Sequence, residues 1–492
     1  MIHFGVIAPA FSSHFQVLQA LASALVDKGH RVTFIHQADT RPFVTDPRIG
    51  FEAVGADTHP LGSLAHTIRA AANPGSPWGL RRVIVDLARC TDMLCREVPA
   101  AISRLGIDAL LCDQMEAAGG LIGDGVGLPY VSIACALPVN REPGVPLPVM
   151  PFVWDDTEKS AQMAAQSERI YDWMMTPHRR VIESRAAGFG LSRRGALHEC
   201  LSPLAQVSQI IPEFDFPRRS LPAQFHYVGP LRPVDTSGPP LPWPIENDRP
   251  FVFASLGTVQ GYRLDLFKRI AQACRRVDAQ LLVGHCGGLN AQQARELEAA
   301  GATWVTDYAP QGAALMRADA VVSHGGLNTV LDAMATRTPM LAMPIAFDQP
   351  GAAARMVRIG AGRRASPRFA TVGRLTTLLR ELLDDTEMAG RLEGLSAAVL
   401  RAGGTRRAVE IILDAVEGRV TANRQTCGEG QLPGALRMPA AVAQGGSAFA
   451  QGGSAAAEGG SAVAQGGSAA AHRTAHGDDG SAKARAPAAQ PA

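Results

Sequence analysis

Several features that define other classes of protein are missing from this sequence. Its eight cysteines lie far apart, and none forms the Cys-x-x-Cys pair that is typical of a zinc site or a redox centre. We therefore expect reduced and mostly buried thiols. No segment approaches the ~18 consecutive apolar residues of a membrane-spanning helix, so any contact with a membrane is expected to be peripheral.

An excess of one sign of charge is also missing. The chain has 47 lysine and arginine residues against 45 aspartate and glutamate residues, and its basic residues are scattered rather than gathered in a block. We therefore expect no nucleic-acid partner. The first residues form an apolar run without the basic and apolar regions of a secretory leader. This favours a cytoplasmic protein, whose contact with the inner membrane, if any, is peripheral.

The length of the chain predicts two folded domains. At 492 residues it exceeds the ~250–300 residues at which a single core stops growing. In the first half, helical patterns separate apolar runs, as in a parallel sheet with helices on both faces. These predicted strands are residues 2–8, 32–35, 109–112 and 130–134. Residues 1–228 are thus predicted to form a Rossmann-like domain.

Proline marks the boundary between the two predicted domains. Residues 229–250 contain seven prolines, a density that excludes regular helix or sheet and predicts a stiff linker. After the linker, strand and helix patterns alternate again, with a helix at residues 266–276. The predicted strands here are residues 251–255, 281–283, 304–305, 321–323 and 340–343. Residues 251–418 are thus predicted to form a second Rossmann-like domain.

The end of the chain has a repetitive composition. From residue 444 the heptapeptide [Gln/Glu]-Gly-Gly-Ser-Ala-x-Ala occurs four times in succession. A period of seven can indicate a coiled coil, but a pair of glycines in each repeat costs ~2 kcal/mol of helix propensity. Residues 419–492 are therefore predicted to be a disordered tail.

A cluster of glycine and polar residues follows the predicted strand at residues 321–323. Two glycines allow a tight turn and a close approach to a ligand, and the next helix offers free N–H groups to an anion. This pattern predicts a diphosphate site, with a ribose-binding carboxylate on the same helix face. Its residues are His324, Gly325, Gly326, Asn328, Thr329 and Asp332.

A polar turn without a ligand is the alternative interpretation of this motif. The presence of Gln311 upstream and of Asp348 and Gln349 downstream argues against it. The segment beginning at His285 nearly copies the motif, but it has no acid at the position that matches Asp332. We interpret that second segment as an ordinary loop between a strand and a helix.

Together these residues resemble the signature of the UDP-glycosyltransferase superfamily, whose members have two facing Rossmann-like domains, the GT-B fold. The resemblance covers about residues 1–418 and makes the second domain the one that binds a nucleotide sugar. It implies that His324, Asn328 and Thr329 hold the diphosphate and that Asp332 holds the ribose. The remaining assignments are Thr258 to the phosphates, Tyr308 and Gln311 to the uracil base, and Asp348 and Gln349 to the sugar hydroxyls.

A candidate catalytic base lies in the first domain. His14 directly follows the first predicted strand, where doubly wound folds bind ligands. An alcohol is a poor nucleophile unless its proton leaves as the new bond forms, and imidazole titrates near neutral pH. His14 resembles the base of the family, and Asp113 resembles the acid that orients it. A helix-capping role is the alternative for Asp113.

A narrower resemblance concerns the acceptor. Residues 93–99, 113–116, 136–143, 171–174, 202–206 and 211–217 are similar to the family of bacterial zeaxanthin glucosyltransferases. The resemblance implies an acceptor-binding first domain and an inverting transfer of glucose from UDP-glucose, as co-substrate, to the ring hydroxyls of this carotenoid. Mono- and diglucosides would form, and neither a metal nor another cofactor is expected.

Three alternatives remain at this point. The acceptor could be another apolar molecule, such as a macrolide, a flavonoid or a terpenoid. The chain could also be a glycosyltransferase-like partner protein that has lost catalysis, although the presence of both His14 and Asp113 argues against this. A nicotinamide-dependent oxidoreductase is disfavoured, because no Gly-x-Gly-x-x-Gly follows the first strand.

Overall fold

The computed structural model describes residues 1–73, 76–232 and 241–427. The described part of the first half contains these elements: β1 (His3–Ile7), α1 (Ser12–Asp27), β2 (Arg31–His36), η1 (Ala38–Phe43), β3 (Gly50–Ala53), α2 (Ser63–Ala72), α3 (Pro77–Leu105), β4 (Ala109–Asp113), α4 (Ala117–Val126), β5 (Tyr130–Ala134), α5 (Glu158–Met174), α6 (Thr176–Gly188), η2 (Leu197–Cys200), β6 (Gln206–Ser208) and β7 (Phe225–Tyr227).

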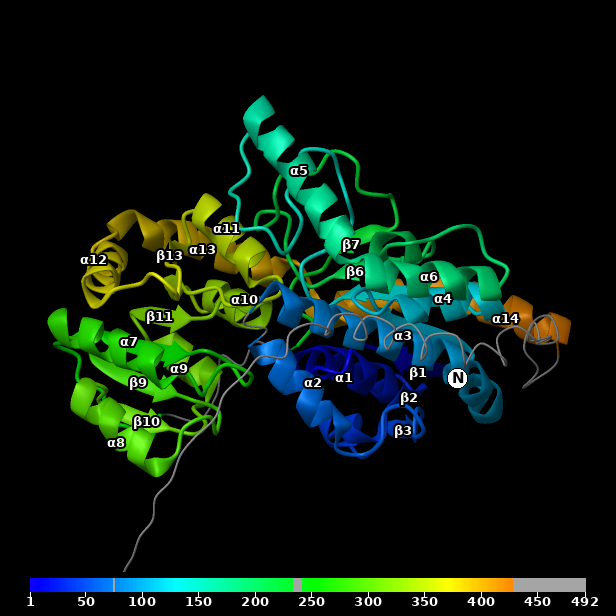
Figure 1. The fold of residues 1–492 in the computed structure, drawn as a ribbon, viewed down its shortest axis with the longest axis horizontal. Helices are drawn as coiled ribbons and strands as arrows, with labels where there is room; N and C mark the ends of the chain where they lie inside the picture. The colour runs from blue at the N-terminus through cyan, green and yellow to red at the C-terminus, as the bar shows by residue number, and fades with distance from the viewer. Residues whose placement is uncertain (74–75, 233–240, 428–492) are drawn as a thin grey trace, which may run out of the picture. The chain divides into compact units, whose positions relative to one another are not determined.

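The second half continues the same alternation of strands and helices (Figure 1). Its described elements are β8 (Phe251–Ser255), α7 (Leu264–Arg276), β9 (Gln280–Gly284), α8 (Ala291–Ala300), β10 (Trp304–Thr306), α9 (Gln311–Arg317), β11 (Ala320–Ser323), α10 (Leu327–Ala335), β12 (Met340–Ala342), α11 (Gln349–Arg358), β13 (Gly362–Arg364), α12 (Val372–Leu383), α13 (Thr386–Arg401) and α14 (Gly404–Cys427).

The first half is built on a parallel sheet with the strand order β3-β2-β1-β4-β5-β6-β7. Its central strands β1, β4 and β5 are buried throughout and mostly apolar, because helices cover both faces. Phe4 and Val6 of β1 belong to the core cluster that includes α1. Ile7 belongs to the cluster on the opposite face, which includes Met93 and Leu94 of α3. The period of two in the strand thus supplies two hydrophobic layers.

The second half is built on another parallel sheet, with the order β10-β9-β8-β11-β12-β13. Helices α7 and α8 lie beside strands β9 and β10, as the green part of Figure 1 shows. The two-sheet α/β architecture confirms the predicted fold class. In each sheet the strand order reverses once, between β1 and β4 and between β8 and β11, and doubly wound folds bind ligands at the carboxyl ends of such strands.

Helix α14 packs against the first sheet rather than the second. Its Ala408, Ile412, Val416 and Val420 belong to the same core cluster as the apolar residues of α1. These positions recur at helical spacing, so one apolar face is buried. The domain boundary predicted at residue 418 falls inside this helix, and residues 419–427 are helical rather than part of a disordered tail. Residues 428–492, the remainder of the predicted tail, lie outside the described residues.

The described parts of the predicted linker, residues 229–232 and 241–250, contain no helix or strand. Residues 233–240 lie outside the described residues. Among the helices that the structure describes, none has both the length and the apolar composition needed to cross a bilayer.

Candidate active site

The first cluster of predicted site residues lies at the carboxyl ends of two neighbouring strands, β1 and β4. The first turn of α1 carries His14, and β4 ends at Asp113. Because Ile7 pairs with Cys112 in the sheet, both side chains emerge at the same edge. Asp113 Oδ2 lies 2.7 Å from His14 Nδ1, and Asp113 Oδ1 accepts a 2.9 Å hydrogen bond from the Met115 amide. The sheet thus holds a buried carboxylate against one nitrogen of the imidazole.

Asp113 does more than end a strand or cap a helix. The N-cap of α4 is Glu116, whose carboxylate accepts a 3.0 Å hydrogen bond from the Ala118 amide. Asp113 is therefore free to bond the imidazole of His14. Since Nδ1–H donates to this carboxylate, the neutral ring carries its lone pair on Nε2. No hydrogen bond within the described part of the chain engages Nε2, so this nitrogen is able to accept a proton.

Charges from both halves of the chain act on His14. Burial alone would lower the pKa of His14, but the charge and hydrogen bond of Asp113, with a further contribution from Asp348, raise it above the ordinary value. Burial raises the pKa of Asp348, although the Leu137 amide and His14 act in the opposite direction. The ring of Phe347, which precedes Asp348, also lies 5.5 Å from the ring of Phe11, which precedes α1, so the segment with Asp348 lies beside the segment with His14.

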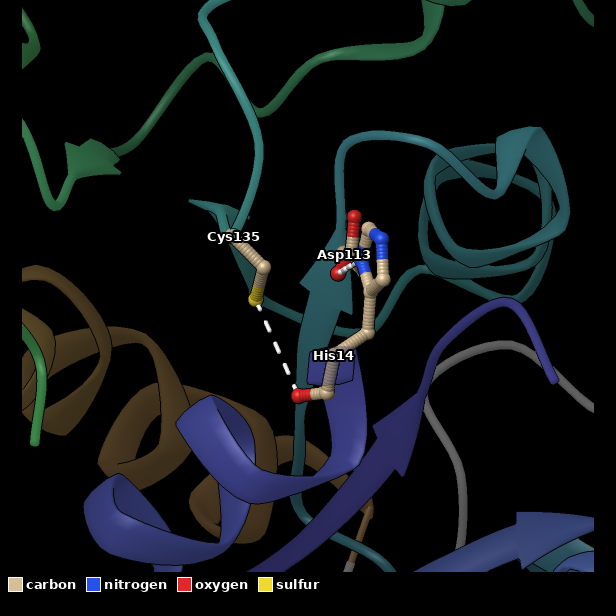
Figure 2. Close-up of side chains that lie close together, drawn as sticks. All are labelled: His14, Asp113 and Cys135. Carbon is tan, nitrogen blue, oxygen red and sulfur yellow. Dashed lines mark hydrogen bonds and ion pairs between the residues drawn. The ribbon is translucent and has the colours of Figure 1, made fainter. Parts of the chain in front are cut away.

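Cys135 lies beside the dyad, just beyond the end of β5 (Figure 2). Its Sγ is 4.0 Å from the backbone oxygen of His14, and the potential ligand atoms of His14, Asp113 and Cys135 lie within 4.8 Å of one another. A metal would require the thiolate. Burial raises the pKa of the Cys135 thiol well above its ordinary value, and Asp113 adds to the effect. The chemistry of these groups favours a hydrogen-bonded dyad beside a neutral thiol.

The second cluster lies at the carboxyl ends of β8 and β11, and His324 occupies its centre. A Cβ at Gly257 would lie 2.7 Å from the ring carbon Cε1 of His324, and a Cβ at Gly326 would lie 2.6 Å from Nε2. Glycine at both positions therefore lets two loops close on the imidazole, and Gly257 and Gly325 also have positive φ of 76° and 78°. Burial lowers the pKa of His324 to about 4, so its ring is neutral at neutral pH.

The polar residues of α10 make specific contacts. Asn328 Oδ1 accepts a 3.1 Å hydrogen bond from Gln209 Nε2, which leaves the amide group of Asn328 as a donor. Asp332 Oδ2 accepts from Arg232 at 2.6 Å and from Gln311 at 2.7 Å. Asp332 Oδ1 is buried without a hydrogen-bond partner among the described residues. Because an unpaired buried carboxylate oxygen is costly, this atom is suited to accept from a ligand hydroxyl.

The predicted sugar-binding pair lies where the loop after β12 enters α11. Asp348 Oδ2 accepts a 3.1 Å hydrogen bond from the Leu137 amide. Gln349 Oε1 accepts from the amides of Ile345 and Ala346 at 2.8 and 2.9 Å. Gln349 thus uses its carbonyl oxygen to shape the loop, and its Nε2 group is the part that remains for a ligand.

The other predicted donor-site residues differ in exposure. Thr329 is buried at 8% exposure, whereas Thr258 is exposed and the Tyr308 ring is 70% exposed. An exposed ring can stack on a planar base. No side-chain hydrogen bond joins Thr258 or Tyr308 to the other predicted residues within the described part of the chain. The structure therefore brings Gln311 together with Asp332 and the dyad near Asp348, whereas Thr258 and Tyr308 are not joined to these groups by a side-chain hydrogen bond among the described residues.

The loop that begins at His285 has a local role. His285 Nε2 lies 3.1 Å from Asp307 Oδ1, and Nδ1 accepts a 3.1 Å hydrogen bond from the Leu289 amide. Both ring nitrogens are engaged inside the protein. This geometry fits an ordinary loop that supports the segment just before Tyr308.

Sequence reasoning missed three residues of the site: Arg232, Gln209 and Cys135. Arg232 lies in the proline-rich segment, 100 residues from its partner Asp332. Gln209 reaches Asn328 from the first half, 119 residues away. Neither residue belongs to a motif, so no local pattern distinguishes it. The only signal for Cys135 was its position after a predicted strand at the same sheet edge as Asp113.

Comparison with known proteins identifies the family. Residues 198–397 match the family model described as UDP-glucoronosyl and UDP-glucosyl transferase. The chain is also 49% identical over 415 residues to the zeaxanthin glucosyltransferase of Pantoea ananas. The aligned region covers 84% of this chain and 95% of that relative. The chain belongs to the UDP-glycosyltransferase family. The glycosyltransferase is likewise 46% identical over 420 residues to the zeaxanthin glucosyltransferase of Pseudescherichia vulneris, covering 85% and 99% of the two chains.

Solved structures agree with the fold of this glycosyltransferase. The glycosyltransferase of kitacinnamycin matches with a TM-score of 0.67 and 20% identity, over 84% of this chain and 99% of that one. The calicheamicin glycosyltransferase CalG4 matches with a TM-score of 0.66 and 18% identity, over 85% and 99%. At such identities the likeness shows the fold alone. It confirms the GT-B architecture that the sequence motifs predicted.

Proposed function

We propose that this glycosyltransferase transfers glucose from UDP-glucose to the ring hydroxyls of zeaxanthin, giving first the monoglucoside and then the diglucoside. The observation that carries the proposal is the His14–Asp113 pair, 2.7 Å apart, in a chain that matches two zeaxanthin glucosyltransferases at 49% and 46% identity. The dyad supplies a base for an alcohol, and the relatives suggest which alcohol.

In the proposed reaction, Nε2 of His14 takes the proton of the acceptor hydroxyl. The hydroxyl oxygen attacks the anomeric carbon from the side opposite UDP, and the bond between that carbon and the diphosphate oxygen breaks. UDP leaves with the bonding electrons, so the configuration inverts and a β-glucoside forms. Asp113 stabilises the imidazolium and holds the ring in the tautomer that the reaction requires.

The second half would hold the donor. His324, Asn328, Thr329 and Thr258 would donate to the diphosphate, together with the amides that follow Gly325 and Gly326 at the start of α10. These donors would stabilise the charge that accumulates on the departing UDP, so we propose a reaction without a divalent metal. Support comes from the neutral His324 ring, which the two glycine loops enclose.

The nucleoside and sugar would occupy the neighbouring groups. The unpaired Oδ1 of Asp332 supports its assignment to the ribose. Tyr308 would stack on the uracil, and Gln311, which now bonds Asp332, would contact the base from the same side. Asp348 and the Nε2 group of Gln349 would bind glucose hydroxyls.

The proposed acceptor is mostly hydrocarbon and dissolves in membranes. The proposal therefore includes peripheral contact of the enzyme with a membrane that contains the acceptor. Comparing acceptor in detergent micelles with acceptor in lipid vesicles addresses this point. Faster transfer in the vesicle assay at equal acceptor concentration would support membrane contact, and equal rates would argue against it.

The test of the function is a turnover assay with purified protein. We expect zeaxanthin and UDP-glucose to give products that are heavier by one and by two hexoses in mass spectrometry. His14→Ala should abolish both products, whereas His66→Ala, a change at an exposed residue of α2, should leave them unchanged. If, in a parallel panel, sugar is transferred only to a macrolide, a flavonoid or another terpenoid, that compound replaces zeaxanthin as the proposed acceptor. Absence of turnover with every acceptor would favour an inactive partner protein.

A further inference from the structure

One face of α11 is turned toward the first half of the chain. Asp348, which precedes the helix, accepts from the Leu137 amide. Gly351 packs so tightly on Pro148 that an added Cβ would lie 2.0 Å from the proline carbonyl oxygen. Positions 348, 351, 355 and 358 follow the spacing of one helix face. The helix that carries the proposed sugar-binding pair is therefore also an element that joins the two halves.

The strongest contact on this face is an ion pair between Arg355 of α11 and Asp215 of the first half. Arg355 Nε lies 2.8 Å from Asp215 Oδ1, and the two side chains are 0% and 1% exposed. The guanidinium of Arg355 also lies over the ring of Phe216, 4.1 Å from its centroid. One turn further on, the guanidinium of Arg358 lies 5.2 Å from the ring centroid of Trp154.

Residues of the first half hold the carboxylate of Asp215 in place. Its Oδ1 accepts from the Phe216 amide at 2.8 Å, and its Oδ2 accepts from Tyr227 at 2.9 Å and from Arg218 at 3.1 Å. Burial would raise the pKa of Asp215, but the guanidinium groups of Arg355 and Arg218 hold it below the ordinary value. The two guanidinium groups thus keep the carboxylate ionised, and its contacts within the first half fix its direction.

A buried ion pair is a costly way to join two halves. Desolvation of the two charges offsets most of their attraction, and apolar residues of similar volume often give equal or greater stability. The pair does restrict the orientation of α11, because a planar guanidinium bonds a fixed carboxylate in few relative orientations. Apolar contacts between the halves are already present, since Leu137, Ile210, Ile211 and Phe214 belong to the core of the second half.

We propose that Asp215 and Arg355 are positioning residues, which fix α11 so that Asp348 presents the transferred sugar to His14. The inference rests on the proposed role of Asp348 in binding sugar hydroxyls. It assigns a function to Asp215, which lies in the segment 211–217 and to which the resemblance to the family gives no role. A displacement of about 1 Å at the reacting atoms is enough to lower a rate ~10²-fold, so the register of α11 matters for the chemistry.

The test compares Arg355→Lys with Tyr227→Phe. Both changes weaken hydrogen bonding to Asp215, but Tyr227 belongs to the first half and does not hold α11. For Arg355→Lys we expect kcat to fall at least tenfold and the preference for UDP-glucose over UDP-galactose to shrink. Calorimetric affinity for UDP should stay within about twofold, because the proposed UDP contacts lie outside α11. Tyr227→Phe should keep both kcat and the sugar preference close to wild type.

A second variant covers the case in which Arg355→Lys does not fold. The variant Arg355→Met removes the charge from α11 but leaves Asp215 paired with the buried Arg218, so it should remain folded in thermal unfolding. We expect it to show the same loss of kcat and of sugar preference. Wild-type kcat and preference in this variant, or equal losses in Arg355→Lys and Tyr227→Phe, would overturn the proposal. All rates are also measured as UDP-glucose hydrolysis without acceptor, so a wrong acceptor assignment does not affect the result.

Discussion

The two ring nitrogens of His14 have different surroundings, and this difference predicts how substitutions combine. His14→Ala removes the base and should lower kcat by ~10²–10⁴-fold while UDP affinity stays near wild type. Asp113→Asn should lower kcat less, because the imidazole remains. The double variant should be little slower than His14→Ala, since the two residues act as one unit. Steady-state rates and UDP calorimetry test this, and independent, multiplying losses would mean that Asp113 has another role.

The raised pKa of His14 predicts the pH dependence of the rate. The base must be neutral to accept a proton, so kcat/KM should fall as the pH drops through the pKa of His14, which lies above its ordinary value. Asp113 stabilises the protonated ring, so Asp113→Asn should lower this pKa and move the acid limb of the profile toward lower pH. Rate profiles of the two proteins are the measurement. An acid limb that does not move would show that another group controls it.

At the residue scale, sequence reasoning found side chains that lie in motifs and missed those that act from a distance. His14 and Asp113 were paired through the resemblance to the family, and in the structure they lie 2.7 Å apart at one edge of the sheet. Nothing in the sequence showed that the carbonyl oxygen of Gln349 accepts hydrogen bonds from the Ile345 and Ala346 amides. The bond of Arg232 to Asp332 was equally invisible, because it depends on how the chain folds back over 100 residues.

Helix α14 predicts that the true end of the folded part lies beyond residue 418. Val420 is 3% exposed in the core of the first sheet, and Arg424 Nη2 lies 2.6 Å from Asp108 Oδ2. Burial of one valine contributes about 1.5–3 kcal/mol. A chain that ends at residue 418 should therefore melt several degrees below one that ends at residue 427, whereas the latter should match the full chain. Thermal unfolding of the three proteins tests this, and identical transitions for all three would contradict it.

At the element scale, the sequence revealed the strands with long apolar runs. β5 and β8 have the predicted bounds, because central strands covered on both faces consist of consecutive buried residues. The edge strands β3, β7 and β13 were missed. They have three or four residues and are mostly half-buried, so their sequences show no clear alternation of apolar and polar residues. The helical end of α14 was missed because its stability comes from the burial of Val420 against the first sheet, a contact that local composition does not reveal.

Buried neutral histidines predict how the stability of the whole molecule responds to acid. His178 is 3% exposed and bonds Thr91 at 3.0 Å, and burial lowers its pKa to about 4. An unfolded histidine has a pKa near 6.5, so between these values the unfolded state binds a proton that the folded state excludes. His178 therefore destabilises the fold increasingly as the pH falls from 6.5 to 4.

The variant His178→Gln retains an N–H donor but does not titrate. Relative to wild type, its free energy of unfolding should improve by about 1 kcal/mol for each pH unit below 6.5. Denaturant titrations at several pH values measure this difference. His66→Gln, a change at an exposed residue, is the matched control and should follow wild type. If the free energy of unfolding changes with pH equally in His178→Gln and wild type, protonation of His178 does not control the stability in acid.

The return of α14 to the first sheet also has a consequence for biosynthesis. Strands β1 to β7 leave the ribosome long before residues 404–427 are translated, so the face of the sheet that α14 covers has no partner during that interval. Contacts of such large sequence separation form slowly. A ribosome that stalls anywhere in the second half therefore leaves the first sheet with an uncovered apolar face. We therefore expect the first half to reach its final packing only after residues 404–427 have been translated.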